Sequence, residues 1–123
     1  MLKEGLKLEE EYTVEKQHLA SYVGSGEVDV LATPCLIAFI ENACLKLVNK
    51  YIEGGLISVG YRVDVKHLAP APLNSKVKVR VELVKIFRNH LVFKAEAYIN
   101  DKKIAEGEHE RVLVSKEEFL KRV

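Results

Sequence analysis

The chain has 123 residues, of which 48% are hydrophobic and 30% charged, and its formal net charge is +1. This length and balance predict one globular domain that spans residues 1–123. The small net charge gives no reason to expect nucleic acid or an anionic membrane as a partner. No apolar run approaches the ~20 residues that cross a bilayer, and the start of the chain is charged, so we expect a cytoplasmic protein.

The first part of the chain predicts a strand, a loop and one long helix. Residues 8–16 form a plausible strand, and the two glycines within residues 21–30 indicate a loop. The stretch LATPCLIAFIENACLKLVNKYIEGG, residues 31–55, has the apolar period of an amphipathic helix.

The ends of this helix carry local signals. Thr33 is placed to act as the N-cap, Pro34 fits the first helical position, and Gly54-Gly55 is expected to end the helix. Cys35 and Cys44 lie nine positions apart on it, too far for an intrahelical disulfide, so we expect buried free thiols.

After the helix the apolar period changes to two, which predicts strands. In ISVGYRVDVKH the odd-numbered residues from Ile57 to Val65 are apolar and are expected to face the core. Two prolines predict a loop at 68–75. Alternation resumes in KVKVRVELVKIF and HLVFKAEAYIN, with a turn at Arg88-Asn89-His90 between them.

The last part of the chain, KKIAEGEHERVLVS, predicts another strand, with Gly107 as a bulge. Ser115 and Glu118 have the spacing of a capping box and predict a short final helix. The order of one strand, one helix and four strands predicts an α+β fold, in which an antiparallel sheet wraps around one long central helix. Since one helix cannot cover both faces of such a sheet, we expect a homodimer or a higher homo-oligomer.

Glu41 stands out on the predicted helix. It lies roughly 125° from the centre of the polar stripe at about 100° per residue, among residues that should face the core. Burying a carboxylate without a partner costs several kcal/mol. Either Glu41 pairs with a basic group across a subunit interface or reaches water, or it lies in a pocket as a base or nucleophile.

His67 and Thr33 bear on that choice. His67 continues the odd-numbered series and closes its strand, where it is either a core residue or part of a site. The Thr33 hydroxyl either caps the helix or points at a substrate carbonyl. Together with Glu41, the two side chains suggest acyl transfer.

Two further residues are weaker candidates. Gly60 interrupts a good strand, which indicates a bulge or the close approach of a ligand. In GEHER, residues 107–111, Glu108 and Glu110 share one face while His109 and Arg111 share the other. Arg111 is most simply a solvated or salt-bridged residue, and it would hold an anionic group if it faced a site.

No metal or cofactor is expected. The histidines and cysteines show no metal-ligand spacing. The chain has no glycine pattern of a nucleotide-binding loop and no nucleophile elbow.

The chain resembles the fluoroacetyl-CoA thioesterase-like family of hotdog-fold thioesterases. The matching segments follow one another over most of residues 31–114: ATPCLIAFIENAC, SVGYRVDVKHLAPAP, KVKVRVELV, LVFKAEAYIND and AEGEHERVLV. The resemblance implies that Thr33, Glu41 and His67 are catalytic and that Gly60 and Arg111 belong to the substrate pocket. It also implies a hotdog dimer whose active sites lie between subunits.

The implied activity is hydrolysis of an acyl-CoA to free acid and CoA. Which of Glu41 and His67 acts as the base stays open. In the fluoroacetyl-specific enzyme an aromatic-rich insertion before the helix forms a lid. Here that region is the short YVGSGEVDVLATP with Tyr22 as its only aromatic, which favours a general short-chain acyl-CoA substrate.

Two other functions compete with hydrolysis. One is a non-catalytic hotdog module that binds acyl-CoA, although binding alone does not require a buried carboxylate. The other is a hotdog hydratase or dehydratase, which would need an Asp/His pair on its helix that the sequence lacks.

Overall fold

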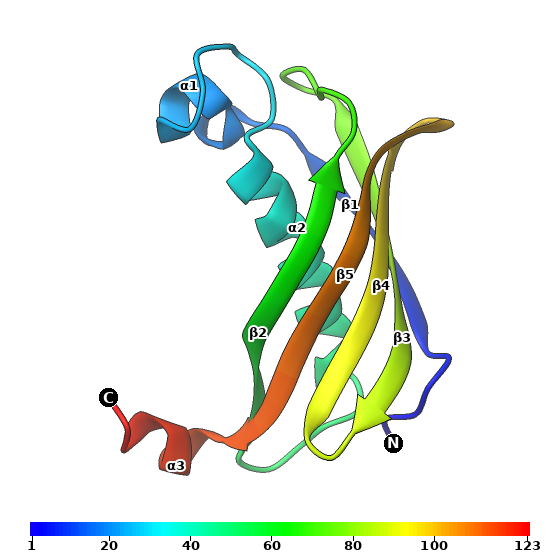
Figure 1. The fold of residues 1–123 in the computed structure, drawn as a ribbon, viewed down its shortest axis with the longest axis vertical. Helices are drawn as coiled ribbons and strands as arrows, with labels where there is room; N and C mark the ends of the chain where they lie inside the picture. The colour runs from blue at the N-terminus through cyan, green and yellow to red at the C-terminus, as the bar shows by residue number, and fades with distance from the viewer.

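One antiparallel sheet curves around a single long helix, α2, in the computed structural model, which describes residues 1–123 (Figure 1). The strands lie in the order β1-β3-β4-β5-β2, so β1 and β2 form the two edges. The predicted α+β architecture is therefore confirmed. The elements in chain order are β1 (Lys7–Thr13), η1 (Lys16–His18), α1 (Ala20–Val23), α2 (Thr33–Asn49), β2 (Leu56–His67), β3 (Lys76–Phe87), β4 (His90–Ile99), β5 (Lys102–Ser115) and α3 (Lys116–Leu120).

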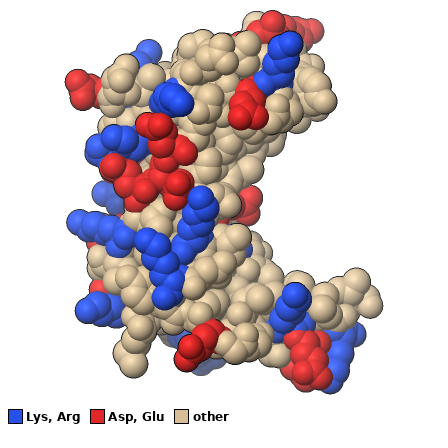
Figure 2. Space-filling view, turned by 180° about the vertical axis from the view of Figure 1, so that it is seen from behind, with Lys and Arg blue, Asp and Glu red and all other residues tan.

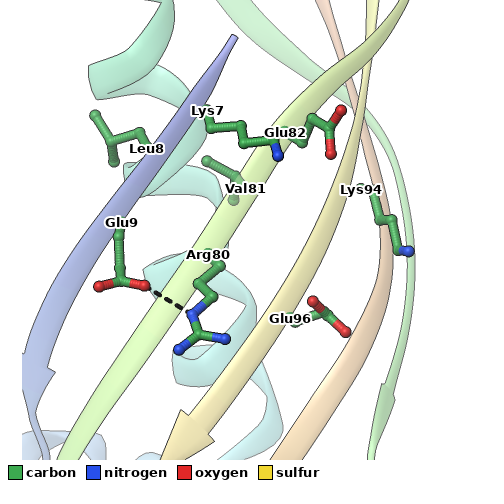
Figure 3. A pocket seen from close by; sticks show the side chains of 8 residues that line it. All are labelled: Lys7, Leu8, Glu9, Arg80, Val81, Glu82, Lys94 and Glu96. Carbon is green, nitrogen blue, oxygen red and sulfur yellow. Dashed lines mark hydrogen bonds and ion pairs between the residues drawn. The ribbon is translucent and has the colours of Figure 1, made fainter. Parts of the chain in front are cut away.

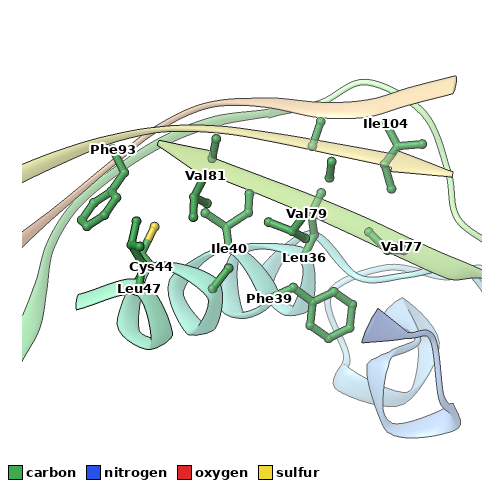
Figure 4. Close-up of a cluster of buried hydrophobic side chains, with 14 of the residues drawn as sticks. Leu36, Phe39, Ile40, Cys44, Leu47, Val77, Val79, Val81, Phe93 and Ile104 are labelled. Atoms are coloured by element: carbon green, nitrogen blue, oxygen red, sulfur yellow. The ribbon is translucent and has the colours of Figure 1, made fainter. Parts of the chain in front are cut away.

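The core lies between α2 and the concave face of the sheet (Figure 4). Leu36, Ile40 and Leu47 of the helix are at most 1% exposed, and they meet alternate residues of β3 and β4. Complete burial of each such side chain stabilises the fold by about 1.5–3 kcal/mol. The strand residues in this layer are those of the predicted apolar series, namely Val77, Val79, Val81, Leu83, Leu91, Phe93, Ala95 and Ala97.

The ends of α2 differ from the prediction. Ala32, not Thr33, is the N-cap residue, and no side chain caps this end. The helix ends at Asn49, because the next two amides close tight turns onto Leu47 and Val48. Gly54, with φ of +71°, then provides the left-handed residue in the turn that leads into β2.

The bulge in this pair of strands lies in β2 rather than in β5. The register of β2 against β5 shifts between Gly60 and Arg62, whereas Gly107 pairs regularly with Val65. Gly107 is required for a different reason, since a Cβ there would lie 2.1 Å from the carbonyl oxygen of Asp64. The bulge prediction for Gly107 was therefore wrong, and the bulge that was an alternative for Gly60 is confirmed.

The bulge also changes which residues of β2 face the helix. Ser58 is only 6% exposed, whereas Tyr61 is 65% exposed, so the expected inward odd-numbered series fails in the first half of the strand. Beyond the bulge, Val65 packs against the core and His67 lies opposite the buried Ala105. One extra residue therefore moves the inward face from even to odd positions.

The connecting segments agree only partly with the predictions. The loop at 68–75 and the start of α3 are as expected, and the Ser115 hydroxyl accepts a hydrogen bond from the amide of Glu118. The turn before β4 is tighter than expected, because His90 already belongs to the strand. The sequence also did not predict η1 and α1, which hold the chain between β1 and α2.

The free edge of β2 faces a hollow side of the molecule. In Figure 1 this strand lies between the end that carries α1 and the end that carries α3, and Figure 2 shows the surface hollowed between those ends. The hollow is lined mostly by uncharged side chains, while charged side chains gather on the opposite side of the view. No helix is both long and apolar enough to span a bilayer.

Candidate active site

Thr33 and His67 meet at one end of the fold. Thr33 is the first residue of α2 and His67 is the last of β2. The Oγ1 atom of Thr33 lies 2.8 Å from Nδ1 of His67. The threonine hydroxyl is therefore engaged by the imidazole and not by the helix backbone, which corrects the N-cap interpretation.

The second nitrogen of His67 is buried without a partner. Its Nε2 atom is buried and forms no hydrogen bond of ordinary geometry. Burial lowers the pKa of His67 below its ordinary value of 6.5 and outweighs the opposite effect of a contact with the backbone of Ala69, which favours the neutral imidazole. A buried polar atom without a hydrogen bond costs free energy and calls for an explanation, and use by a ligand or in a proton transfer is one such explanation.

A cleft of about 360 Å³ opens beside this pair. Thr33 and His67 contribute its polar side chains together with Ser25, and the remaining lining is mostly small and apolar. The lining comes from α1, the start of α2 and the loop after β2, so it combines segments that are far apart in the sequence. A cleft of this type suits a short apolar acyl group next to a reactive carbonyl.

Glu41 lies further along α2 in a different group of residues. Eight positions separate it from Thr33, or about 12 Å along the helix. The half-buried carboxylate faces Gly60, where a Cβ would lie 3.0 Å from Oε2 of Glu41. No hydrogen bond within the chain joins Glu41 to Thr33 or His67. Within one chain the predicted site residues therefore fall into two separate groups, Thr33 with His67 and Glu41 with Gly60.

Arg111 belongs to the Glu41 half. It is 6% exposed, and its Nε donates to Ser58 Oγ at 2.8 Å while Nη2 donates to the Ser58 carbonyl at 3.0 Å. The simplest interpretation from sequence, a solvated or salt-bridged side chain, was wrong. Burial lowers the pKa of Arg111, but its ordinary value is so high that the guanidinium stays charged.

His109 and Cys44 also lie near this group, and no role was predicted for either of them from the sequence. His109 is fully buried, and its Nε2 accepts a hydrogen bond from Arg111 Nη1 at 3.0 Å. Alternation in GEHER correctly placed His109 beside Arg111, but nothing local indicated that this face is buried. The Cys44 thiol is buried and free, and burial raises its pKa.

Another depression lies on the outer face of the sheet, across β1, β3 and β4 (Figure 3). Its lining is mostly charged, and two of the charged side chains pair with each other, with Arg80 Nε 2.7 Å from Glu9. It contains neither a nucleophile nor a histidine, so it is a solvated sheet face. No group of three or more His, Cys, Asp or Glu side chains is arranged to hold a metal ion.

With this geometry established, the comparisons identify the family. A model of the fluoroacetyl-CoA-specific thioesterase family matches residues 14–117. The fluoroacetyl-CoA thioesterase of Streptantibioticus cattleyicolor is 30% identical over 95 residues, which cover 77% of this chain and 68% of that protein. The chain belongs to this family, which confirms the predicted enzyme class, a thioester hydrolase.

Solved structures confirm the hotdog fold. A point mutant of the fluoroacetyl-CoA-specific thioesterase FlK superposes with a TM-score of 0.93 at 24% identity, over 100% of this chain and 96% of that one. A hypothetical protein of Thermus thermophilus, described as a thioesterase superfamily member, gives 0.87 at 27% identity over 98% and 91%. A hot-dog-like protein from Thermanaerovibrio acidaminovorans gives 0.88 at 24% identity over 97% and 88%.

Proposed function

We propose that this protein hydrolyses a short-chain acyl-CoA to the free acid and CoA, with Thr33, Glu41 and His67 as catalytic residues. The observation that carries the proposal is the Thr33–His67 pair, whose unpartnered Nε2 is buried beside a mostly apolar cleft. Family membership supports the reaction class. The substrate pocket includes Gly60 and Arg111, which lie next to Glu41.

The chemistry follows from the properties of these groups. Either the Glu41 carboxylate attacks the thioester carbonyl, giving an anhydride that water then cleaves, or it takes a proton from the water that attacks. In both cases the carbon–sulfur bond breaks, and the proton that converts the thiolate to CoA thiol comes from the water that is consumed, with His67 accepting it and passing it to the sulfur. Amide groups at the start of α2 suit the developing oxyanion, because a helix N-terminus favours negative charge.

We place the complete site between two subunits. The two halves of the site do not meet by a hydrogen bond within one chain, and the free edge of β2 borders the hollow side of the molecule (Figure 2). Apolar side chains are exposed along this edge, with Leu56 at 46%, Tyr61 at 65% and Val63 at 38%. An uncovered edge of this kind favours pairing with a second copy.

A cytoplasmic location and a single domain over residues 1–123 stay predictions from the sequence.

Thiol release from a panel of short- and medium-chain acyl-CoAs tests the proposal. We expect release by the native protein and its loss in both Glu41→Ala and His67→Ala, with each variant still folded by circular dichroism. The panel also identifies the acyl group and includes fluoroacetyl-CoA. Binding without release by the native protein would instead indicate a non-catalytic acyl-CoA-binding module, and hydration of an enoyl-CoA would indicate a hydratase.

A further inference from the structure

Arg111 is a buried cation held by neutral acceptors. Its Nε and Nη2 atoms donate to the side chain and carbonyl of Ser58, and Nη1 donates to His109. No carboxylate forms an ion pair with it, and Glu41 acts on it only through space. A buried charge without a direct counterion depends on such hydrogen bonds for its position.

The guanidinium of Arg111 faces the same small space as the Glu41 carboxylate. The point where a Cβ of Gly60 would lie is 3.0 Å from Glu41 Oε2 and 3.9 Å from Arg111 Nη1. His109 Cε1 lies 3.7 Å from the same point. Because Gly60 has no side chain, this space stays open between the carboxylate and the guanidinium.

The tautomer of His109 is fixed by its surroundings. Its Nδ1 lies 2.9 Å from the carbonyl oxygen of Arg62, which can only accept, so the proton is on Nδ1. The lone pair of Nε2 is then free to accept from Arg111 Nη1. Burial lowers the pKa of His109, which keeps the ring neutral and preserves this acceptor.

The carbonyl that fixes this tautomer lies directly after the β2 bulge. Arg62 follows the register shift, and its carbonyl points to His109 on the inner face. Its side chain lies on the outer face, where Nη2 contacts Glu108 at 2.9 Å and Nε contacts Glu110 at 3.2 Å. Both carboxylates are neighbours of His109 on β5. Arg62 therefore contacts β5 through its carbonyl on the inner face and through its side chain on the outer face.

We propose that His109 is a positioning residue, whose neutral Nδ1–H imidazole orients the Arg111 guanidinium beside Gly60 and Glu41 in the substrate pocket. The proposal rests on the proposed thioesterase function for its effect on turnover. It assigns His109 an action through Arg111 rather than contact with the substrate. The Arg62 carbonyl, next to the β2 bulge, selects the tautomer that accepts from Arg111.

Two amide variants separate the two hydrogen bonds of His109. Gln places its amide near the position of Nε2, so His109→Gln can still accept from Arg111. Asn places its amide near the position of Nδ1, so His109→Asn can still donate to the Arg62 carbonyl but does not reach Arg111. The two changes are otherwise matched in chemistry, and His109→Leu removes both hydrogen bonds.

The kinetic test measures kcat/KM for thiol release and the thermal midpoint for all three variants. We expect His109→Gln to stay within about threefold of the native protein, and His109→Asn and His109→Leu to lose about tenfold or more, as loss of one hydrogen bond to a charged group predicts. A merely structural role would instead make activity follow thermal stability across the series. Equal kcat/KM in the Asn and Gln variants would overturn the proposal.

Nitrogen-15 NMR of the native protein tests the same geometry without substrate. We expect His109 to carry its proton on Nδ1 and the Nη1 protons of Arg111 to exchange slowly, and this protection of Nη1 should persist in His109→Gln and be lost in His109→Asn. A proton on Nε2 of His109, or a freely exchanging Arg111, would overturn the proposal. If the native protein releases no thiol from any acyl-CoA, the proposed function fails, while this measurement still decides the role of His109.

Discussion

The Thr33 hydroxyl lies 2.8 Å from Nδ1 of His67 and therefore joins the first residue of α2 to the last residue of β2. The two elements approach each other at this end of the fold, where the cleft opens. Because this hydroxyl does not cap the helix, its contribution to catalysis can be separated from its contribution to stability.

Replacing Thr33 by valine should lower turnover without unfolding the protein. Thr33→Val removes the hydroxyl at nearly constant volume, and we expect kcat to fall about tenfold, as loss of one hydrogen bond predicts. Thr33→Ser is the matched control and should retain most of the activity. The free energy of unfolding from urea titration should fall by only about 0.5–1.5 kcal/mol, which is the net contribution of one hydrogen bond. A loss of stability of this size with unchanged turnover would show that the hydroxyl has only a structural role.

Adding a methyl group at Gly60 should displace the Glu41 carboxylate. The new Cβ would lie 3.0 Å from Oε2, closer than an ordinary contact, and the flexible end of Glu41 would move away. We expect Gly60→Ala to lower kcat/KM by about tenfold or more, because small misplacements of a catalytic group are costly. The fold should survive, since a side-chain end and not backbone must move.

Gly55 provides the control for this substitution. A Cβ at Gly55 would meet nothing within 4 Å, so Gly55→Ala should leave the rate of thiol release unchanged. Equal activity of the Gly60→Ala and Gly55→Ala variants would show that the position of Glu41 against β2 has no importance for the reaction.

The acid limb of the pH–rate profile should lie below pH 6.5. Burial lowers the pKa of His67 from that ordinary value, so the imidazole stays neutral and able to accept a proton at lower pH than a free histidine. We expect kcat/KM to decline only as the pH drops through this lowered pKa. A midpoint at or above 6.5 would contradict the role of a buried His67.

The same shift predicts the direction of the stability change with pH. The unfolded chain binds a proton at His67 more readily than the folded chain, so folding stability falls as the pH drops from 6.5 towards the lowered pKa. His109 shifts in the same direction and adds to the effect. Thermal midpoints measured above and below pH 6.5 test this sign, and a rising midpoint in acid would contradict it.

Mixing two inactive variants should restore activity if the site lies between subunits. A mixed dimer of Glu41→Ala and His67→Ala has one site with both residues intact and one with neither. Random exchange makes half of the dimers mixed, so we expect recovery to about a quarter of the native rate per protomer. Native mass spectrometry confirms the exchange. Mixed dimers without recovered activity would place the complete site within one protomer.

The sequence by itself determined the elements whose pattern is local. The apolar period of α2 and the alternation in β3 and β4 predicted the core, because helices and strands repeat their faces at fixed intervals. Alternation in GEHER placed His109 and Arg111 on one face, and the offset of Glu41 from the polar stripe marked it as unusual. The resemblance to thioesterases identified the family, which the comparisons confirm.

Only the tertiary structure decided which faces are buried and which side chains meet. The bulge at Gly60 reverses the alternation of β2, and its position depends on pairing with β5, about 50 residues away in the chain. The Thr33 hydroxyl turns to His67, and Arg111 is enclosed by Ser58 and His109 instead of reaching water. These contacts join residues distant in sequence, so no local pattern of charge or hydrophobicity could specify them.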